Sequence, residues 1–255
     1  MSCAELSTTR CKYTIFFNKP IYKLCASAYA AKDQYRLRSF KDRCYKWGYF
    51  PNIPDLNILD IIHSRTSSNS CMMMWCARFI DWKHPEMPIK LAAELKSKGY
   101  SFHIDMFGNG PELAKMECLT EHLNVKEYVS FKGNLPNDLL MEEMRRHDIF
   151  IFTSDQQEGW GAVANEAMGN GCALVASDMI GSVPYLVEDG VTGMIFKSCN
   201  LASLTEKVEE LIHDSVLRQQ IVVNAYNKMV KIWSPSNAAK NLLTLIHDLQ
   251  MGYDT

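Results

Sequence analysis

The chain has 255 residues, of which 47% are hydrophobic and 22% are charged, and its formal net charge at pH 7 is −2. This composition is typical of a globular protein with an apolar core, and the near-neutral charge gives no general attraction to nucleic acid. The nine cysteines show neither C-x2-C spacing nor a zinc-finger pattern with histidine, which favours free thiols in a reducing compartment over disulfides or a metal site.

The beginning of the chain carries no recognisable targeting signal. Its first residues, MSCAELSTTR, lack the basic start and apolar run of a secretory signal. The most apolar early stretch, YTIFFNKPIYKLCASAYAA, contains Asn18, Lys19, Pro20 and Lys23 and is too polar to span a bilayer. We therefore expect no transmembrane segment and a cytoplasmic protein, either free or peripheral at the inner face of the membrane.

The N-terminal region differs from the rest of the chain. Residues 21–52 have the pattern strand, helix, strand, and a single βαβ unit is too small to bury a core of its own. We interpret residues 1–63 as the remnant of an N-terminal domain that is mostly absent from this chain. Residues 64–70, SRTSSNS, are predicted to be a polar linker.

From residue 71 onward, short apolar runs alternate with amphipathic helical segments. The predicted strands lie at 72–79, 101–107, 128–133, 148–154, 172–177 and 193–196. Because the runs are almost continuously apolar, both faces of the sheet should be buried. This pattern predicts an α/β fold over 71–232, a doubly wound, Rossmann-like parallel sheet with helices on both faces and ligands at the carboxyl ends of the strands.

Helices dominate the remainder of the chain. Proline opens three helices of the repeating pattern, at Pro85, Pro111 and Pro136, where its missing N–H has no partner in a first helical turn. The chain becomes entirely helical after residue 199. A C-terminal helix is predicted within 233–255, with Ser234 as its N-cap residue and a proline directly after it.

Residues 155–171, DQQEGWGAVANEAMGNG, combine a helix start with two carboxylates. The first N–H groups of a helix attract an anion, and Gly159 and Gly161 leave this helix start open to close approach. Glu158 and Glu166 add acceptors that suit hydroxyl groups rather than anions. A ligand that carries both phosphates and hydroxyls, such as a nucleotide sugar, satisfies both features.

Cations and a second glycine-rich turn are expected at the same edge of the sheet. Arg78 lies at the carboxyl end of the first predicted strand of the repeat, Lys83 follows five residues later, and FGNGPE (107–112) forms another strand-to-helix turn. The chain contains no D-x-D sequence, so a metal ion held by paired carboxylates is not predicted.

Segment 71–231 resembles the C-terminal domain of family 4 glycosyltransferases with the GT-B fold. The two glutamates match the E-x7-E signature of that family. The matching motifs occur in the order and spacing of the family, and they are CARFIDWKHPE, FHIDMFGNGPE, VSFKGN, EGWGAVANEAMGNGCALVASD and VPYLVEDGVTGMIF. YKWGYFP resembles the stretch before the interdomain linker of these enzymes.

The resemblance implies transfer of a hexose-type sugar, with retention and without metal or cofactor, from a nucleotide diphosphate donor such as a UDP- or GDP-sugar. The acceptor would be a hydroxyl of a carbohydrate or lipid-linked molecule, as in polysaccharide biosynthesis. Arg78 and Lys83 would clamp the diphosphate, Glu158 would hold the donor sugar, and Glu166 would accept the ribose hydroxyls. The remaining implied donor-binding residues are Gly108, Asn109, Gly110, Gly133, Asn134, Gly159, Trp160, Gly161 and Ala162.

Some features depart from the family and leave alternatives open. Ala77 and Tyr185 occupy positions where the family usually has glycine and often has glutamate, respectively. The short N-terminal region allows two further interpretations: a non-catalytic nucleotide-sugar-binding remnant, or half of a split enzyme with a separate N-terminal half. A doubly wound protein of other chemistry is the third alternative, although no G-x-G-x-x-G follows the first strand of the repeat, which argues against a nicotinamide enzyme.

Overall fold

The computed structural model describes residues 21–65 and 70–251. The chain divides into two compact units, Met1–Tyr49 and Phe50–Thr255. The expectation that the first ten residues form no targeting signal, and the larger part of the predicted linker, lie outside the described residues.

The first unit contains the predicted strand, helix and strand. They are β1 (Lys23–Cys25), α2 (Ala30–Arg36) and β2 (Cys44–Lys46). The two strands are parallel, with Lys23 opposite Cys44. Tyr35 is 71% exposed, which fits the small apolar area that a unit of this size can bury.

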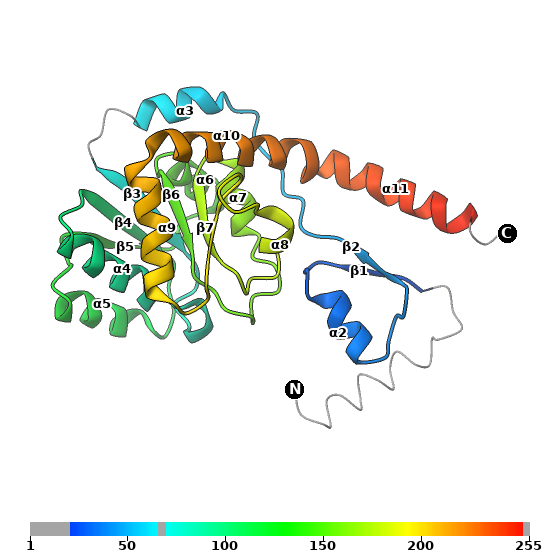
Figure 1. Cartoon of the computed structure of the whole chain (residues 1–255), viewed down its shortest axis with the longest axis horizontal. Helices are drawn as coiled ribbons and strands as arrows, with labels where there is room; N and C mark the ends of the chain where they lie inside the picture. The colour runs from blue at the N-terminus through cyan, green and yellow to red at the C-terminus, as the bar shows by residue number, and fades with distance from the viewer. Residues whose placement is uncertain (1–20, 66–69, 252–255) are drawn as a thin grey trace. The chain divides into compact units, whose positions relative to one another are not determined.

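The second unit begins earlier in the sequence than the predicted boundary after residue 63. Helix α3 (Ile58–Arg65) packs against α10 (Ser215–Ile232) (Figure 1). Ile58 and Ile62 are buried in the core of this unit. The apolar face of α3 therefore joins residues 50–65 to the second unit rather than to the N-terminal region.

The six predicted strands of the second unit form one parallel sheet, as expected. They are β3 (Cys71–Cys76), β4 (Phe102–Phe107), β5 (Val129–Gly133), β6 (Ile149–Phe152), β7 (Ala173–Ser177) and β8 (Met194–Phe196). Their spatial order is β5-β4-β3-β6-β7-β8, which is the doubly wound arrangement of Rossmann-like proteins. β4 and β5 are therefore added on one side of β3, and β6, β7 and β8 on the other side.

Helices cover both faces of this sheet (Figure 1). α4 packs against α5 and α9, and α7 packs against α6 and α10. Pro85 and Pro136 occupy N-cap positions, one residue before the predicted first turn, where the missing N–H is equally harmless. The bounds are α4 (Glu86–Ser97), α5 (Leu113–His122), α6 (Asn137–Met144), α7 (Val163–Gly169), α8 (Val183–Leu186), α9 (Leu201–His213) and α11 (Pro235–Met251), with a 3-10 turn, η1, at Asp81–Lys83.

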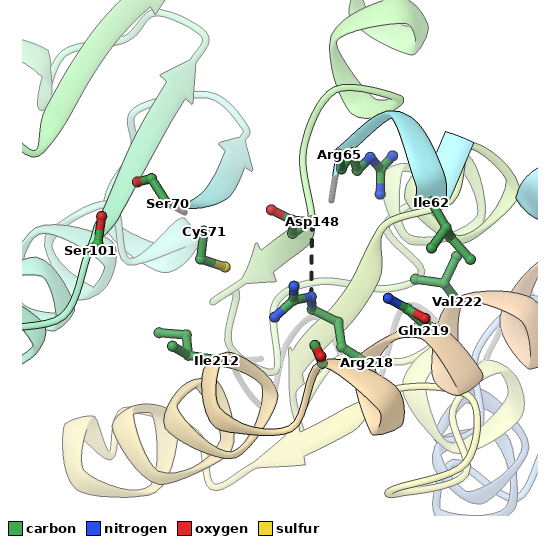
Figure 2. Close-up of a pocket in the computed structure, with 11 residues that line it drawn as sticks. Ile62, Arg65, Ser70, Cys71, Ser101, Asp148, Ile212, Arg218, Gln219 and Val222 are labelled. Carbon is green, nitrogen blue, oxygen red and sulfur yellow. Dashed lines mark ion pairs between the residues drawn. The ribbon is translucent and has the colours of Figure 1, made fainter. Parts of the chain in front are cut away.

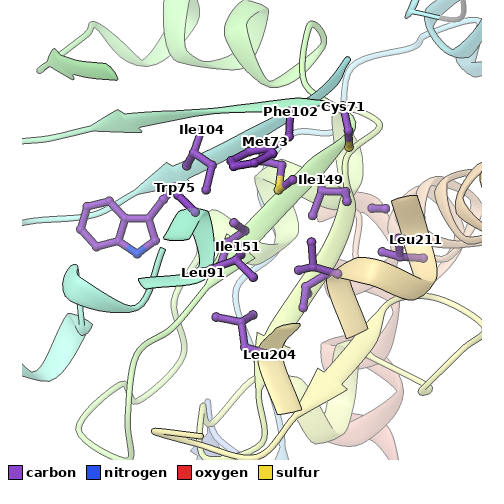
Figure 3. Close-up of a cluster of buried hydrophobic side chains, with 14 of the residues drawn as sticks. Cys71, Met73, Trp75, Leu91, Phe102, Ile104, Ile149, Ile151, Leu204 and Leu211 are labelled. Carbon is purple, nitrogen blue, oxygen red and sulfur yellow. The ribbon is translucent and has the colours of Figure 1, made fainter. Parts of the chain in front are cut away.

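The core lies on both sides of the sheet. Consecutive residues Met73, Met74 and Trp75 of β3 are all at most 1% exposed, which requires cover on both faces because successive strand side chains point in opposite directions. Leu91 and Leu204 close one side of the cluster against the strands (Figure 3). Over residues 21–65 and 70–251, no helix is both long and apolar enough to cross a membrane.

A cavity of about 340 Å³ lies at the amino edge of the sheet, bordered by Arg65, Cys71, Asp148 and Arg218 (Figure 2). The charged side chains that border it contact other groups of the same chain. Arg218 donates to the carbonyl of Leu211 at 2.6 Å, and its Nε lies 3.9 Å from Asp148 Oδ1. Asp148 Oδ2 accepts a hydrogen bond from the backbone N–H of Met72, the second residue of β3, at 3.0 Å.

Arg65 joins the ends of two helices at this edge. Its guanidinium donates to the carbonyls of Met144 and Arg145 at the end of α6, at 3.2 and 2.7 Å, and to that of Gly171 after α7, at 2.7 Å. A cation is favourable there because helix C-termini present unpaired carbonyls and negative dipole ends. Burial lowers the pKa of Arg65, and arginine remains charged at neutral pH despite such a shift.

Replacement of this partly buried cation should destabilise the fold. We expect Arg65→Met to lower the free energy of unfolding by about 2–4 kcal/mol, because several buried carbonyls lose their donors. The control is Arg146→Met, which removes an exposed pair with Glu143 and should cost at most about 0.5 kcal/mol. Urea unfolding followed by circular dichroism measures both values, and equal losses would contradict the role of Arg65.

Candidate functional site

The loops that follow β3 and β6 meet at the carboxyl edge of the sheet. β3 pairs directly with β6, with Met73 opposite Ile149, and the backbone N–H of Asp155 donates to the carbonyl of Trp82 at 3.1 Å. This is the topological switch point of the sheet, where open α/β folds form their ligand sites. It lies at the opposite edge from the cavity at Arg65.

An ion pair connects these two loops. Lys83 Nζ donates to Glu158 Oε2, and Ser154 Oγ donates to the same oxygen at 3.2 Å. The side chains of Lys83 and Glu158 are only 14% and 10% exposed. The lysine ammonium also lies 4.3 Å from the centroid of the Trp82 ring. Partial burial strengthens such a pair and makes the loss of either partner costly.

The loop that carries Lys83 is fixed from the core. The Trp75 indole Nε1 donates to Thr153 Oγ1 at 2.9 Å, and the Thr153 hydroxyl donates to the carbonyl of Lys83 at 2.6 Å. Trp75 and Thr153 are both 1% exposed. These hydrogen bonds therefore hold the backbone of Lys83 in a fixed position relative to β3 and β6.

Glu166, in α7, differs from Glu158 in its surroundings. Within the described part of the chain its carboxylate makes no hydrogen bond or ion pair, and burial raises its pKa. The thiol of Cys76, at the end of β3, has a pKa raised to about 12, chiefly by burial and then by the charge of Glu166, while Lys83 opposes the rise. Glu166 and Lys83 therefore both lie close enough to Cys76 to act on it electrostatically.

One of the two glycines in the turn before α7 is needed for the shape of this edge. Gly161 has φ +76°, and a Cβ there would overlap the ring of Phe152 and lie 3.3 Å from Glu158 Cδ. Only glycine permits the carboxylate to pack so closely against the turn. Gly159 is different, because a Cβ there would meet nothing within 4 Å, so that side of the turn is open.

The second glycine-rich turn lies against the loop that carries Arg78. Gly108 has φ +127°, and a Cβ there would overlap the carbonyl oxygen of Ala77. The N–H of Phe79 donates to the carbonyl of Asn109 at 3.0 Å, and that of Gly108 donates to the carbonyl of Gly133 at 2.8 Å. These bonds bring together the loops after β3, β4 and β5.

Glycine is required at a further point of the same turn. A Cβ on Gly110 would overlap the backbone of Phe79. Asn134 follows β5 directly and is exposed. Ala162 is the N-cap residue of α7, one position before its first helical residue.

Arg78 does not end a strand as predicted, because β3 stops at Cys76. It lies two residues further on, exposed, in the loop before η1. Its guanidinium makes no hydrogen bond or ion pair among the residues that the structure describes. The strand was predicted too long because Phe79, which is buried, continues the apolar pattern beyond the last ladder position.

The side chain of Trp160 is occupied by packing. It is 4% exposed, its Nε1 donates to Asn165 Oδ1 at 2.8 Å, and its ring lies 5.2 Å from that of Trp233 and 6.2 Å from that of Tyr185. Only the backbone of Trp160 is therefore left for the predicted contact with a donor. Tyr185, one of the departures from the family pattern, belongs to this aromatic cluster.

Sequence reasoning missed several residues that build the site. The sequence pattern places Thr153 and Ser154 in a strand, although two hydroxyl residues at the end of the apolar run IFIFTS are an available signal. Trp82 and Asp155 had no such signal. Their contact depends on the pairing of β3 with β6, which sequence spacing does not reveal.

Comparison with known proteins identifies the family. The family model "Glycosyl transferases group 1" matches residues 64–228. The chain is 27% identical over 181 residues to alpha-D-kanosaminyltransferase of Streptomyces kanamyceticus, covering 71% of this chain and 44% of that protein. It is 27% identical over 188 residues to the D-inositol 3-phosphate glycosyltransferase of Corynebacterium diphtheriae, covering 71% of this chain and 43% of that protein. The chain thus spans less than half the length of these relatives.

Solved structures share the fold. Anabaena Alr3699/HepE in complex with UDP superimposes with a TM-score of 0.81 at 18% identity, covering 95% of this chain and 68% of that one. The glycosyltransferase WaaG, involved in lipopolysaccharide biosynthesis, gives a TM-score of 0.69 at 19% identity, covering 95% of this chain and 70% of that one. The family model matches more than half of this chain, which shows that the chain belongs to the glycosyl transferases group 1 family.

Proposed function

We propose that this chain binds a nucleotide diphosphate sugar at the switch point between β3 and β6 and takes part in retaining, metal-independent transfer of a hexose-type sugar, as in family 4 glycosyltransferases. One observation carries the proposal. A partly buried pair between Lys83 and Glu158 joins the loops after β3 and β6, and Glu166 lies in α7, the helix that directly follows the second of these loops.

The pair supplies the two kinds of group that such a donor requires. On binding, the diphosphate would take Lys83 as a partner, with Arg78 as a second cation, and negative charge on the leaving phosphate would be stabilised as the glycosidic bond breaks. Glu158, released from the lysine, would accept hydrogen bonds from hydroxyls of the sugar. A metal ion is not needed in this scheme, because the cations of the chain supply the charge.

Glu166 would accept hydrogen bonds from the ribose hydroxyls. A half-buried carboxylate without donors is unfavourable in the free protein, and a ribose would supply donors for it. The glycine-rich turn at Gly108–Gly110 and the residues at Gly133 would border the rest of the nucleotide. The complexes of Anabaena Alr3699/HepE with UDP and with UDP-glucose support a UDP-sugar as the first donor to test.

A second candidate function is donor binding without independent catalysis. It is favoured by coverage, because the chain spans 44% of the first relative and the match to the family begins at residue 64. The acceptor would then be held by a separate N-terminal half. A carbohydrate or lipid-linked acceptor, at the cytoplasmic side of a membrane, suits either function.

Calorimetric titration with UDP, GDP, UDP-glucose and GDP-mannose tests the donor site. We expect one nucleotide family to bind with a Kd of about 1 μM to 1 mM, the usual range of substrate affinities. Lys83→Met should weaken binding at least about tenfold, whereas the exposed Lys126→Met should not. Glu158→Gln should bind the free nucleotide as well as wild type or better, because Lys83 is released, but should lose the added affinity for the sugar.

The titration also decides between the two functions. Binding of donor together with release of nucleoside diphosphate on addition of an acceptor would favour the complete enzyme. Binding without release would favour the donor-binding half. Absence of heat with all four compounds would contradict both.

The affinity should fall as the pH is lowered, because of Glu166. Burial raises the pKa of this carboxyl in the free protein, and a ribose that donates hydrogen bonds favours the ionised form. Donor binding therefore weakens as the pH falls through that raised pKa. A nucleotide sugar is the suitable probe, because its phosphodiesters do not titrate between pH 7.5 and 5.

Glu166→Gln should abolish this part of the pH dependence and weaken binding about tenfold at pH 7. The same substitution should raise Tm at pH 7 by up to about 3 °C, since it removes a buried charge. The gain should shrink as the pH falls through the raised pKa, because protonation removes the charge of the wild-type carboxyl. Glu142→Gln, on the exposed face of α6, is the control, and identical pH profiles for both variants would contradict the role of Glu166.

Thr153 should act as a positioning residue for Lys83. Thr153→Val keeps the side-chain shape but removes the hydrogen bond to the Lys83 carbonyl and the acceptor of the Trp75 indole. We expect a loss of about 1–3 kcal/mol in the free energy of unfolding and a three- to tenfold loss of nucleotide affinity.

The matched control is Thr120→Val. Thr120 is also buried, and its hydroxyl donates to the carbonyl of Glu117 within α5, at 2.6 Å. This variant should lose stability without losing affinity. Parallel losses of affinity in both variants, measured by urea unfolding and calorimetry, would show that Thr153 acts only on stability.

A further inference from the structure

A thiol and an imidazole from distant parts of the chain meet beside the switch point. Cys199, in the loop after β8, has its Sγ 3.4 Å from His84 Nε2. Two carboxylates flank the same ring, with Asp155 Oδ2 3.5 Å from Nε2 and Glu86 Oε1 3.2 Å from Nδ1. The cysteine is exposed, whereas the histidine side chain is 18% exposed.

Both partners are held in uncommon backbone conformations. His84 has φ +49° and Cys199 has φ +56°, a region that residues other than glycine rarely adopt. His84 ends the turn η1, and its N–H donates to the carbonyl of Asp81 at 2.9 Å. The contact between thiol and imidazole is therefore made by two loops, each with its contact residue in this left-handed region.

We propose that Cys199 is a reactive thiol, activated by His84, that forms mixed disulfides with low-molecular-weight disulfides. A cysteine becomes a strong nucleophile when an adjacent base takes its proton. Asp155 and Glu86 stabilise the imidazolium that results. Asn200, the next residue, is the N-cap of α9, so the thiolate also forms near the positive end of a helix.

The exchange reaction is balanced by groups that are present. The proton of Cys199 passes to His84 Nε2, and the thiolate attacks one sulfur of a disulfide R–S–S–R. A new bond forms between Cys199 Sγ and that sulfur, the original S–S bond breaks, and the other sulfur leaves as a thiolate. This leaving group takes the proton from the imidazolium and departs as R–SH.

The other described cysteines lack this combination of exposure and a base. Burial raises the pKa of Cys71, Cys76 and Cys172 to about 12, and a buried thiol that stays protonated is inert. Cys118, on α5, is exposed, but its thiol makes no hydrogen bond to an imidazole among the described residues. It is therefore a matched internal control for Cys199.

The test is a time course of the whole folded chain with excess oxidised glutathione at pH 7.5, followed by tryptic digestion and mass spectrometry. The two cysteines fall in separate peptides, 198–207 and 116–126. We expect Cys199 to form the adduct at least about tenfold faster than Cys118. In 6 M guanidinium chloride the two rates should become similar, because the contact with His84 depends on the fold.

His84→Asn is the decisive variant, since asparagine tolerates a positive φ but cannot act as the base. We expect the rate at Cys199 to fall to that of Cys118, with the Cys118 rate unchanged. Equal rates in the folded wild-type chain would overturn the proposal without any variant. It would also be overturned by an unchanged Cys199 rate in His84→Asn, or by a rate difference that persists in guanidinium chloride.

Discussion

The ion pair between Lys83 and Glu158 is the constraint on which the carboxyl edge of this protein depends. It joins the loops that follow β3 and β6, and it exists because the reversal of strand order makes those two strands neighbours. Neither charge could be placed in this environment alone, since an unpaired buried charge is costly. Each is therefore the partner of the other, and under the proposed function a ligand that supplies both an anion and hydroxyl donors would replace both contacts at once.

The two glutamates of the E-x7-E pattern are chemically different because of their surroundings. Glu158 is neutralised by Lys83 and receives a hydrogen bond from Ser154, whereas burial raises the pKa of Glu166, whose carboxylate has no such partner within residues 21–65 and 70–251. A carboxylate with removable partners suits the reacting sugar, where charge changes during the reaction. A carboxylate that lacks donors suits a ribose, which brings donors and keeps them. In the proposed function, the two roles therefore follow from the environment of each carboxylate rather than from their spacing.

The strands could be predicted because each is a short, almost continuous apolar run, and the turns because glycine is required at Gly108 and Gly161. The contact between Lys83 and Glu158 could not, since it depends on which strands become neighbours. The packing of α3 could not be predicted for a related reason. Ile58 and Ile62 in α3 are buried by packing on another helix. The sequence of an amphipathic helix shows that it has an apolar face but not which unit covers that face.

The two edges of the sheet show how structural and functional charges can be told apart. Among the described residues, Arg65 at the amino edge donates to backbone carbonyls at the end of α6 and just after α7, and backbone acceptors cannot rotate away as a side chain can. Lys83 at the carboxyl edge donates to a side chain, which can rotate away when a better partner arrives. Arginine with several fixed donors suits the first task, and lysine with one mobile ammonium suits the second. A charge whose partner is replaceable is thus the one available for binding, and in this chain such a charge lies where the order of the strands reverses.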